Sequence, residues 1–424
     1  MAWKSSALDL LRLGPAAWLL CGVALCAATT PSGGLLRQGD RLLFPIGSYE
    51  LPRQEAALRE MAAAGINLVR CHNRRDLERA AGAGLLGWVP LPLQLGPDDM
   101  RLSGLIESVK NHPALAVWEG PDEVVWNFTA YSGLFRNGAY PTADEWWRQT
   151  PLAVDYAEKQ AAALLPKLLA GIRMLRGADP AARPVWINEA ARSDLKFIRR
   201  YVDQIQITGC DIYPIHASRR EPLAVAEYTE RYKRVGRNRP VWMVLQGFAW
   251  GELPGHTEAL AYPSFAETRL MAWLAIAHGA RGLLYWGMDA APPAAAFRQS
   301  LYALTSELAA LQPFLTAPDA PGVRVEVIDS EGFDRPSRGV SWLCRRTAAD
   351  WLVVLINEDD RPHMGVAVSG LEGAGRLELL YGAENVELSQ GEFVTRLLPF
   401  QVKVFATGRN WETARKVGRD FSGL

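Results

Sequence analysis

The chain has no excess charge of either sign. Its 46 Lys and Arg residues equal its 46 Asp and Glu residues, so the formal net charge at pH 7 is zero. Proteins that bind nucleic acids or anionic membranes by electrostatic attraction carry a surplus of positive charge. The balance therefore removes the electrostatic argument for either partner and favours a ligand that is neutral or of mixed charge.

Cysteine is scarce, with five residues in a chain of 424. Two of them, Cys21 and Cys26, lie in an apolar segment at the N-terminus. The other three, an odd number, are Cys71, Cys210 and Cys344. No CxxC pair occurs and no histidine stands at the spacing of a metal ligand. We therefore expect no metal, no cofactor and no disulfide framework, and three free, buried cysteines.

The apolar run at residues 16–28 is too short to span a bilayer comfortably. It follows Lys4 and Arg12 and ends in small residues, as a secretory signal peptide does. We therefore expect residues 1–30 to be a signal peptide and the mature protein to be secreted or periplasmic. An uncleaved signal anchor is the alternative.

The length of the chain and its hydrophobic content of 49% allow a barrel of about 250 residues and one further domain of roughly 100. Between residues 42 and 289, short apolar runs alternate with stretches of helical periodicity, which is typical of parallel strands with crossover helices. No GxGxxG follows the first run, which argues against a doubly wound sheet. We predict a (β/α)8 barrel over residues 38–316. Its strands are expected at 43–49, 66–72, 85–91, 114–120, 184–189, 204–213, 240–247 and 282–286.

A proline-rich hinge at 318–321 leads into short alternating strands separated by turn signals such as Glu372-Gly373. This texture is typical of an antiparallel sandwich. We predict a small β-sandwich over residues 322–408 that serves as a packing module, followed by a tail at 409–424. Its strands are expected at 323–328, 340–344, 351–356, 365–368, 376–380 and 401–405.

The fourth predicted barrel strand runs into two acids, Asp122 and Glu123, four and five residues after Trp118. Side chains at the C-terminal ends of barrel strands point into a shared active-site mouth, which suits a catalytic carboxyl. The alternative is that the two acids cap the next helix.

This segment resembles the fourth strand of the clan A retaining glycoside hydrolases, where a Trp, a short spacer and Asn-Glu occur and the Glu is the acid/base. The resemblance extends over the barrel and the following sandwich and implies that Glu123 is a general acid. Asp122 stands where the family has Asn. A neighbouring carboxylate raises the pKa of Glu123 and favours its proton-donating form, but an ionised Asp cannot donate a hydrogen bond to a sugar hydroxyl as Asn does.

Gln246 ends the seventh predicted strand, about where the resemblance places the nucleophilic Glu. An amide cannot form a glycosyl intermediate, which argues against the ordinary double-displacement route. Three other acids near strand ends could act with Glu123. We favour Asp211, then Glu189, then Glu252. A partner farther than roughly 6 Å from Glu123 would predict inversion of configuration.

Polar and aromatic side chains at other strand ends are expected to form a sugar-binding shell, because a polyhydroxylated ring needs polar groups beside aromatic platforms. The resemblance also places an active-site tyrosine near Tyr213. The predicted substrate-binding residues are Tyr49, Arg70, His72, Asn73, Trp118, Asp122, Tyr213, Gln246, Trp250 and Trp286.

We therefore predict a glycoside hydrolase that acts on an extracellular or periplasmic oligo- or polysaccharide. Gln246 motivates one alternative, a catalytically inactive barrel that binds carbohydrate. A further alternative is a non-hydrolytic barrel enzyme, such as a lyase or a transglycosidase.

Overall fold

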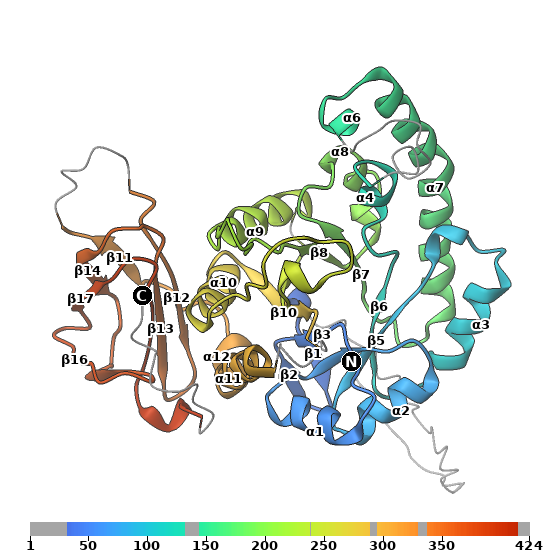
Figure 1. The fold of residues 1–424 in the computed structure, drawn as a ribbon. Helices are drawn as coiled ribbons and strands as arrows, with labels where there is room; N and C mark the ends of the chain where they lie inside the picture. Colours follow the sequence, from blue (N-terminus) through green and yellow to red (C-terminus); the bar gives the residue numbers. More distant parts are fainter. Residues whose placement is uncertain (1–31, 132–143, 238, 289–294, 330–336, 414–424) are drawn as a thin grey trace, which may run out of the picture.

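The computed structural model describes residues 32–131, 144–237, 239–288, 295–329 and 337–413; the predicted signal peptide lies outside these ranges. A barrel surrounded by helices is followed by a separate pair of β-sheets (Figure 1). No helix in the described ranges combines the length and the hydropathy needed to cross a lipid bilayer. Cys71, Cys210 and Cys344 are buried and free, as expected.

Eight parallel strands close into a barrel, each paired with the next along the chain and the last paired with the first. Each coincides with one of the eight predicted strands, so the predicted fold class is confirmed. The barrel strands are β3 (Ile46–Ser48), β4 (Leu68–Arg70), β5 (Leu86–Pro90), β6 (Leu115–Glu119), β7 (Val185–Ala190), β8 (Ile207–Asp211), β9 (Val241–Gln246) and β10 (Ala280–Trp286).

Helices cover the outside of the barrel (Figure 1). They begin at recognisable caps: the side chain of Thr150 caps α7, and Ser264 and Glu267 form a capping box on α10. The helices are α1 (Glu55–Ala63), α2 (Arg74–Gly82), α3 (Met100–Val109), α4 (Val124–Phe128), α6 (Asp144–Trp147), α7 (Pro151–Ala178), α8 (Leu195–Ile198), α9 (Ala224–Val235), α10 (Phe265–Ala277), α11 (Ala295–Ala310) and α12 (Gln312–Leu315).

The lower part of the barrel is filled by aromatic side chains. Trp88, Trp186 and Trp242 are fully buried inside it. The ring of Trp186 lies 6.1 Å from that of Trp88 and 5.6 Å from that of Trp242. Because these rings close the interior, as in other barrels of this type, a ligand has access only at the C-terminal ends of the strands.

A short hairpin of β1 (Leu36–Gln38) and β2 (Arg41–Leu43) precedes the barrel. Leu36 and Leu43 pack with the residues of the barrel interior, and the carbonyl of Gly34 accepts a hydrogen bond from Trp242 Nε1 at 2.9 Å. The first predicted strand, 43–49, is therefore divided: its first residue ends β2 and its second half is β3.

The C-terminal region is a sandwich of a three-stranded sheet, β11-β14-β17, and a five-stranded sheet, β12-β13-β18-β15-β16. β16 and β17 were not predicted: β16 has three residues, and β17 turns Thr395 inward between two apolar residues. The strands are β11 (Arg324–Val327), β12 (Val340–Arg346), β13 (Trp351–Asn357), β14 (His363–Ser369), β15 (Arg376–Leu379), β16 (Asn385–Glu387), β17 (Phe393–Leu397) and β18 (Val402–Ala406).

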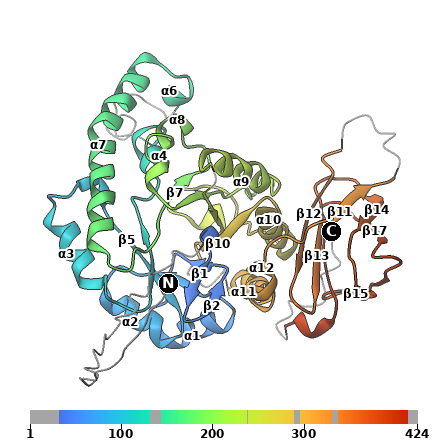
Figure 2. The same ribbon diagram turned by 180° about the vertical axis from the view of Figure 1, so that it is seen from behind.

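The sandwich lies beside α10, α11 and α12, as the view from behind also shows (Figure 2). Arg269 on α10 donates to the carboxylate of Glu307 on α11 at 2.9 and 3.0 Å and to the carbonyl of Val402 on β18 at 2.9 Å. At the end of α10, His278 Nε2 lies 2.9 Å from a carboxylate oxygen of Glu358. Polar contacts thus fix the sandwich to one side of the barrel.

Candidate active site

Glu123 follows β6 and stands immediately before α4. Its φ of 50° lies in the left-handed region, which costs a residue with a Cβ about 1 kcal/mol. The surrounding contacts hold this conformation: the N–H of Glu123 donates to the carbonyl of Asn188 at 2.9 Å, and the side chain of Asn127 donates to the carbonyl of Glu123 at 2.9 Å. The carboxyl does not cap α4. It turns into a cavity instead.

The side chains of Glu123 and Asp211 line the same cavity, and each affects the pKa of the other. Burial raises the pKa of both groups, and the charge of Asp211 raises that of Glu123 further. The proton held on Glu123 in turn favours the ionised form of Asp211. Two carboxylates in contact cannot both be charged at low cost, so the pair holds one proton, and that proton resides on Glu123.

The cavity has a volume of about 570 Å³, within the range of small-molecule sites. It opens at the C-terminal ends of β6, β7 and β8, where barrel active sites lie. One oxygen of Asp211, Oδ1, is buried there without a hydrogen-bond partner among the described residues. The cavity is lined by Glu123, Trp126, Ala190, Ala191, Arg192, Asp211, Ile212, Tyr213, Pro214, Arg219, Glu221, Ala224, Tyr228 and Trp250.

A charged cluster lies beside this pair, on β4 and β6. Arg70 donates to both oxygens of Glu119, at 2.8 and 3.1 Å, and lies 3.7 Å from Asp122. Glu119 also accepts from Trp88 Nε1 at 2.9 Å. Burial outweighs these partners and raises the pKa of Glu119 to about 8. Sequence reasoning missed Glu119, although its place two residues after the inward-facing Val117 indicates that it points into the barrel.

Asp122 is also held by β7. Its Oδ1 accepts from Asn188 Nδ2 at 3.1 Å, and burial raises its pKa. Asn188, likewise missed by sequence reasoning, has a buried Oδ1 with no partner among the described residues. An amide therefore does stand at this end of the barrel, but on β7 and not on the segment that follows β6.

Glu189 is fully buried and accepts hydrogen bonds on all sides. Its donors are the N–H groups of Val125 at 3.0 Å and Trp126 at 3.4 Å, the hydroxyl of Tyr201 at 2.8 Å and that of Ser193 at 2.8 Å. Burial raises its pKa to about 7. Glu189 does not line the cavity. It anchors the N-terminus of α4, the helix that begins next to Glu123.

Gln246 is 0% exposed. Its Oε1 accepts from the N–H of Ile215 at 3.0 Å, and its Nε2 donates to the carbonyls of Ile215 at 2.9 Å and Phe248 at 3.1 Å. No part of the amide is left for a ligand, so the predicted substrate-binding role of Gln246 is wrong. The residue fixes the loop after β8 to the end of β9.

Trp118 and Asn73 are also not substrate-binding residues. Strand alternation turns Trp118 away from the barrel interior; it is 0% exposed and donates to Asp179 Oδ2 at 2.8 Å. Asn73 caps α2, where its Oδ1 accepts from the N–H of Asp76 at 3.0 Å. His72 lies next to it and outside the cavity lining, and burial lowers its pKa.

Aromatic rings gather at the ends of β8, β9 and β10. The ring of Tyr213 stacks on Trp286 with centroids 5.7 Å apart, and Trp250 Nε1 donates to the carbonyl of Tyr213 at 3.2 Å. Phe248, which was not predicted, packs edge-on against Tyr213 at 5.0 Å. The structure thus brings three predicted residues together, and Tyr213 lines the same cavity as Asp211.

Tyr49, a predicted substrate-binding residue, and Glu252, a possible partner of Glu123, have defined contacts. Tyr49 lies under the guanidinium of Arg70, 5.0 Å from it, with its buried hydroxyl unpartnered among the described residues. Glu252 accepts from the hydroxyl of Tyr262 at 2.6 Å and from the N–H of Ala249 at 3.0 Å. Across the described part of the chain, no group of three or more His, Cys, Asp or Glu residues is arranged to hold a metal ion.

The closed barrel and the C-terminal sandwich together give this protein the fold of the clan A glycoside hydrolases. A solved glycoside hydrolase has a TM-score of 0.53 and 13% identity over 87% of this chain and 93% of its own. A glycoside hydrolase of family 5 from Bacteroides vulgatus ATCC 8482 has a TM-score of 0.52 and 14% identity over 86% of this chain and 89% of its own.

A beta-galactosidase from the psychrophilic Marinomonas ef1 is 15% identical, with a TM-score of 0.46 over 63% of this chain, and the chain spans 60% of its length. No family profile and no curated protein sequence matches the chain. The likeness is therefore one of fold, and the activity has to be argued from the site.

Proposed function

We propose that this protein is a glycoside hydrolase that cleaves an O-glycosidic bond in an oligo- or polysaccharide outside the cytoplasm, with Glu123 as general acid. The observation that carries the proposal is that Glu123 and Asp211 line one cavity at the C-terminal end of the barrel. The location rests on the signal-like residues 1–30 alone.

The pair supplies both halves of the reaction. The raised pKa keeps Glu123 protonated, so it donates its proton to the glycosidic oxygen as the bond to the anomeric carbon breaks. Asp211 is ionised, and its unpartnered Oδ1 attacks that carbon and forms a glycosyl ester. Glu123, now a carboxylate, takes a proton from water; the hydroxide attacks the anomeric carbon, and Asp211 leaves as a carboxylate.

This route needs no acid at position 246. Glu123 and Asp211 line the same cavity and each affects the pKa of the other, so we infer that their carboxyl groups are close neighbours. Retaining enzymes hold their carboxyls about 5–5.5 Å apart and inverting enzymes about 6.5–9.5 Å apart. We therefore expect the product to retain the configuration of the substrate, which proton NMR of the first product formed distinguishes.

The neighbouring residues suit binding and positioning. Arg70, Glu119 and Asp122 offer polar hydrogen-bond partners for sugar hydroxyls beside the catalytic pair. Tyr213 and Trp250 offer ring faces on the opposite strands. Glu189 does not line the cavity, and its charge acts on Glu123 only as one cause of the raised pKa. We assign Glu189 the role of a positioning residue that holds α4 and, through it, the backbone of Glu123.

The test is release of reducing ends from a panel of plant, bacterial and host glycans by the mature chain. Glu123→Gln and Asp211→Asn are each expected to reduce turnover by about 10³-fold. Glu107→Gln, at an exposed position on α3, is the matched control and is expected to leave turnover unchanged. Cleavage that survives Glu123→Gln would overturn the assignment of the acid. Binding without cleavage by the unmodified protein would favour a non-catalytic carbohydrate-binding barrel.

A further inference from the structure

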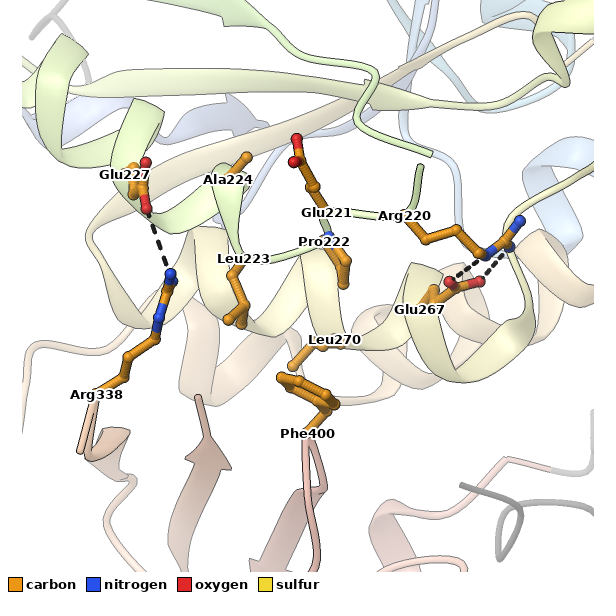
Figure 3. Close-up of a pocket in the computed structure, with 10 residues that line it drawn as sticks. All are labelled: Arg220, Glu221, Pro222, Leu223, Ala224, Glu227, Glu267, Leu270, Arg338 and Phe400. Carbon is orange, nitrogen blue, oxygen red and sulfur yellow. Dashed lines mark hydrogen bonds and ion pairs between the residues drawn. The ribbon is translucent and has the colours of Figure 1, made fainter. Parts of the chain in front are cut away.

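A second cavity, of about 500 Å³, lies between the barrel and the sandwich (Figure 3). One side is formed by the loop before α9 and by the start of that helix. Leu270 of α10 forms its base. The other side belongs to the sandwich, which contributes Arg338 and Phe400.

Charged pairs stand on both sides of an apolar base. Arg220 forms a two-contact ion pair with Glu267 at 2.5 and 2.6 Å, and on the other side Arg338 lies 3.7 Å from Glu227. The ring of Phe400 lies between these pairs, next to Leu270 (Figure 3). An aromatic face with charged hydrogen-bonding groups at its edges is the arrangement that binds the apolar face and the hydroxyls of a sugar ring.

Phe400 has a φ of 56°, in the left-handed region, where a bulky side chain is a rare and strained outlier. Asp359 holds this conformation from below: its carbonyl accepts from the N–H of Phe400 at 3.1 Å, and its carboxylate accepts from the N–H of Arg338 at 2.9 Å. One residue therefore fixes both sandwich segments that face the cavity. Such strain, maintained at a cavity, indicates a function for the ring.

The second cavity is a neighbour of the first. Glu221 and Ala224 line both of them. Two adjacent arginines face different cavities. Arg219 lines the cavity of the catalytic pair, and Arg220 lines the cavity between the domains. The loop before α9 therefore carries residues of both cavities, and a linear ligand bound in both would pass Glu221.

We propose that the cavity between the domains is a distal subsite that binds a sugar unit of the same polysaccharide chain whose bond is cleaved at Glu123. This inference rests on the proposed function and extends it. Phe400 is the stacking platform, and the substrate is a chain of several units, not a disaccharide. The sandwich is then a part of the binding site and not only a packing module.

The test compares hydrolysis of disaccharides and hexasaccharides of the cello, xylo, manno, laminari and β-1,4-galacto series. Phe400→Gly removes the ring and places at φ 56° the residue that adopts it without strain. It is expected to raise KM for the hexasaccharide that is cleaved by about five- to tenfold, with the disaccharide of the same series unaffected. Arg338→Ala, which changes a side chain that is 55% exposed, is expected to act in the same direction.

Tyr381→Gly is the matched control, because Tyr381 is another aromatic residue of the sandwich at positive φ, 62°, and does not line the cavity. It is expected to leave the length dependence unchanged. Hydrogen exchange of the Glu123→Gln protein provides a readout without turnover: the hexasaccharide, but not the disaccharide, is expected to protect residues 397–401.

The outcomes separate the two proposals. Cleavage with the same length dependence in Phe400→Gly and Arg338→Ala, or hexasaccharide binding without protection of residues 397–401, would overturn the distal subsite and leave the hydrolase intact. Absence of both binding and cleavage across all five series and the wider glycan panel would overturn the proposed function, and the subsite with it.

Discussion

The side-chain amide of Gln246 hydrogen-bonds the main chain of Ile215 in both directions, accepting from its N–H at 3.0 Å and donating to its carbonyl at 2.9 Å. Only a group with both a donor and an acceptor can do this. Gln246, which the resemblance places about where clan A enzymes carry their nucleophile, thus fixes a loop in this structure.

Gln246→Glu is therefore expected to destabilise the protein without adding activity. A carboxylate would face the carbonyl oxygens of Ile215 and Phe248 in a fully buried place, at a cost of about 2–4 kcal/mol in the free energy of unfolding. Urea denaturation and reducing-end release measure the two effects. A stable variant with higher turnover would show that position 246 still serves as the nucleophile.

Asp122→Asn introduces the residue that the resemblance to clan A places before the acid. The negative charge of Asp122 is one cause of the raised pKa of Glu123, so its removal is expected to lower that pKa. The sign follows directly: Glu123 must be protonated to act, hence the alkaline limb of the kcat/KM profile shifts to lower pH. An unchanged limb would show that the group titrating there is not Glu123.

Stability is expected to fall as the pH rises from about 4 to 8. Burial raises the pKa of Glu119 to about 8 in the folded protein, above its value in the unfolded chain, so the folded state holds the proton more tightly. That stabilisation is complete below the unfolded pKa and is lost as the pH passes the folded one. Glu119→Gln, which cannot titrate, is expected to flatten the dependence of the free energy of unfolding on pH by on the order of 2 kcal/mol. A profile as steep as that of the unmodified protein would argue against this origin.

Glu189→Ala is expected to disturb catalysis through α4. The change leaves the N–H groups of Val125 and Trp126 and the hydroxyl of Tyr201 without their acceptor, at a cost of about 3 kcal/mol. Because the backbone next to Glu123 loosens, kcat is expected to fall more than KM rises. Glu189→Gln keeps one of the two acceptor oxygens and is expected to recover part of the loss. Ser193→Ala, which removes a single donor to Glu189, serves as the comparison. Equal changes in kcat for Ala and Gln would argue against a positioning role.

The sequence predicts the barrel well because its strands are short apolar runs that alternate with helical segments, a pattern that can be recognised without knowledge of contacts. Asp211 and Tyr213 are likewise predictable, since strand ends face the mouth of a barrel. The expectation that Trp118 faces the barrel interior is wrong. Side chains alternate along a strand, so Trp118 points to the opposite side from Val117 and Glu119, which face the interior.

Other parts of the site depend on partners far away in the chain. Glu189 and Gln246 stand at strand ends like catalytic residues, but their acceptors and donors come from α4 and from the loop after β8. No local pattern reveals these contacts. The subsite proposed at Phe400 is hidden for the same reason, because its two walls are more than a hundred residues apart in the sequence.

Helix α10 has no face toward water: a continuous run from Thr268 to Ile276 is buried. Leu352 and Val404 of the sandwich belong to the same hydrophobic cluster as the helices of the barrel. The barrel and the sandwich therefore share one hydrophobic core and are expected to fold as one unit. A barrel without the sandwich would expose the apolar surface of α10 and is expected to aggregate. A fusion of this barrel to another domain therefore has to retain the five-stranded sheet that packs on α10.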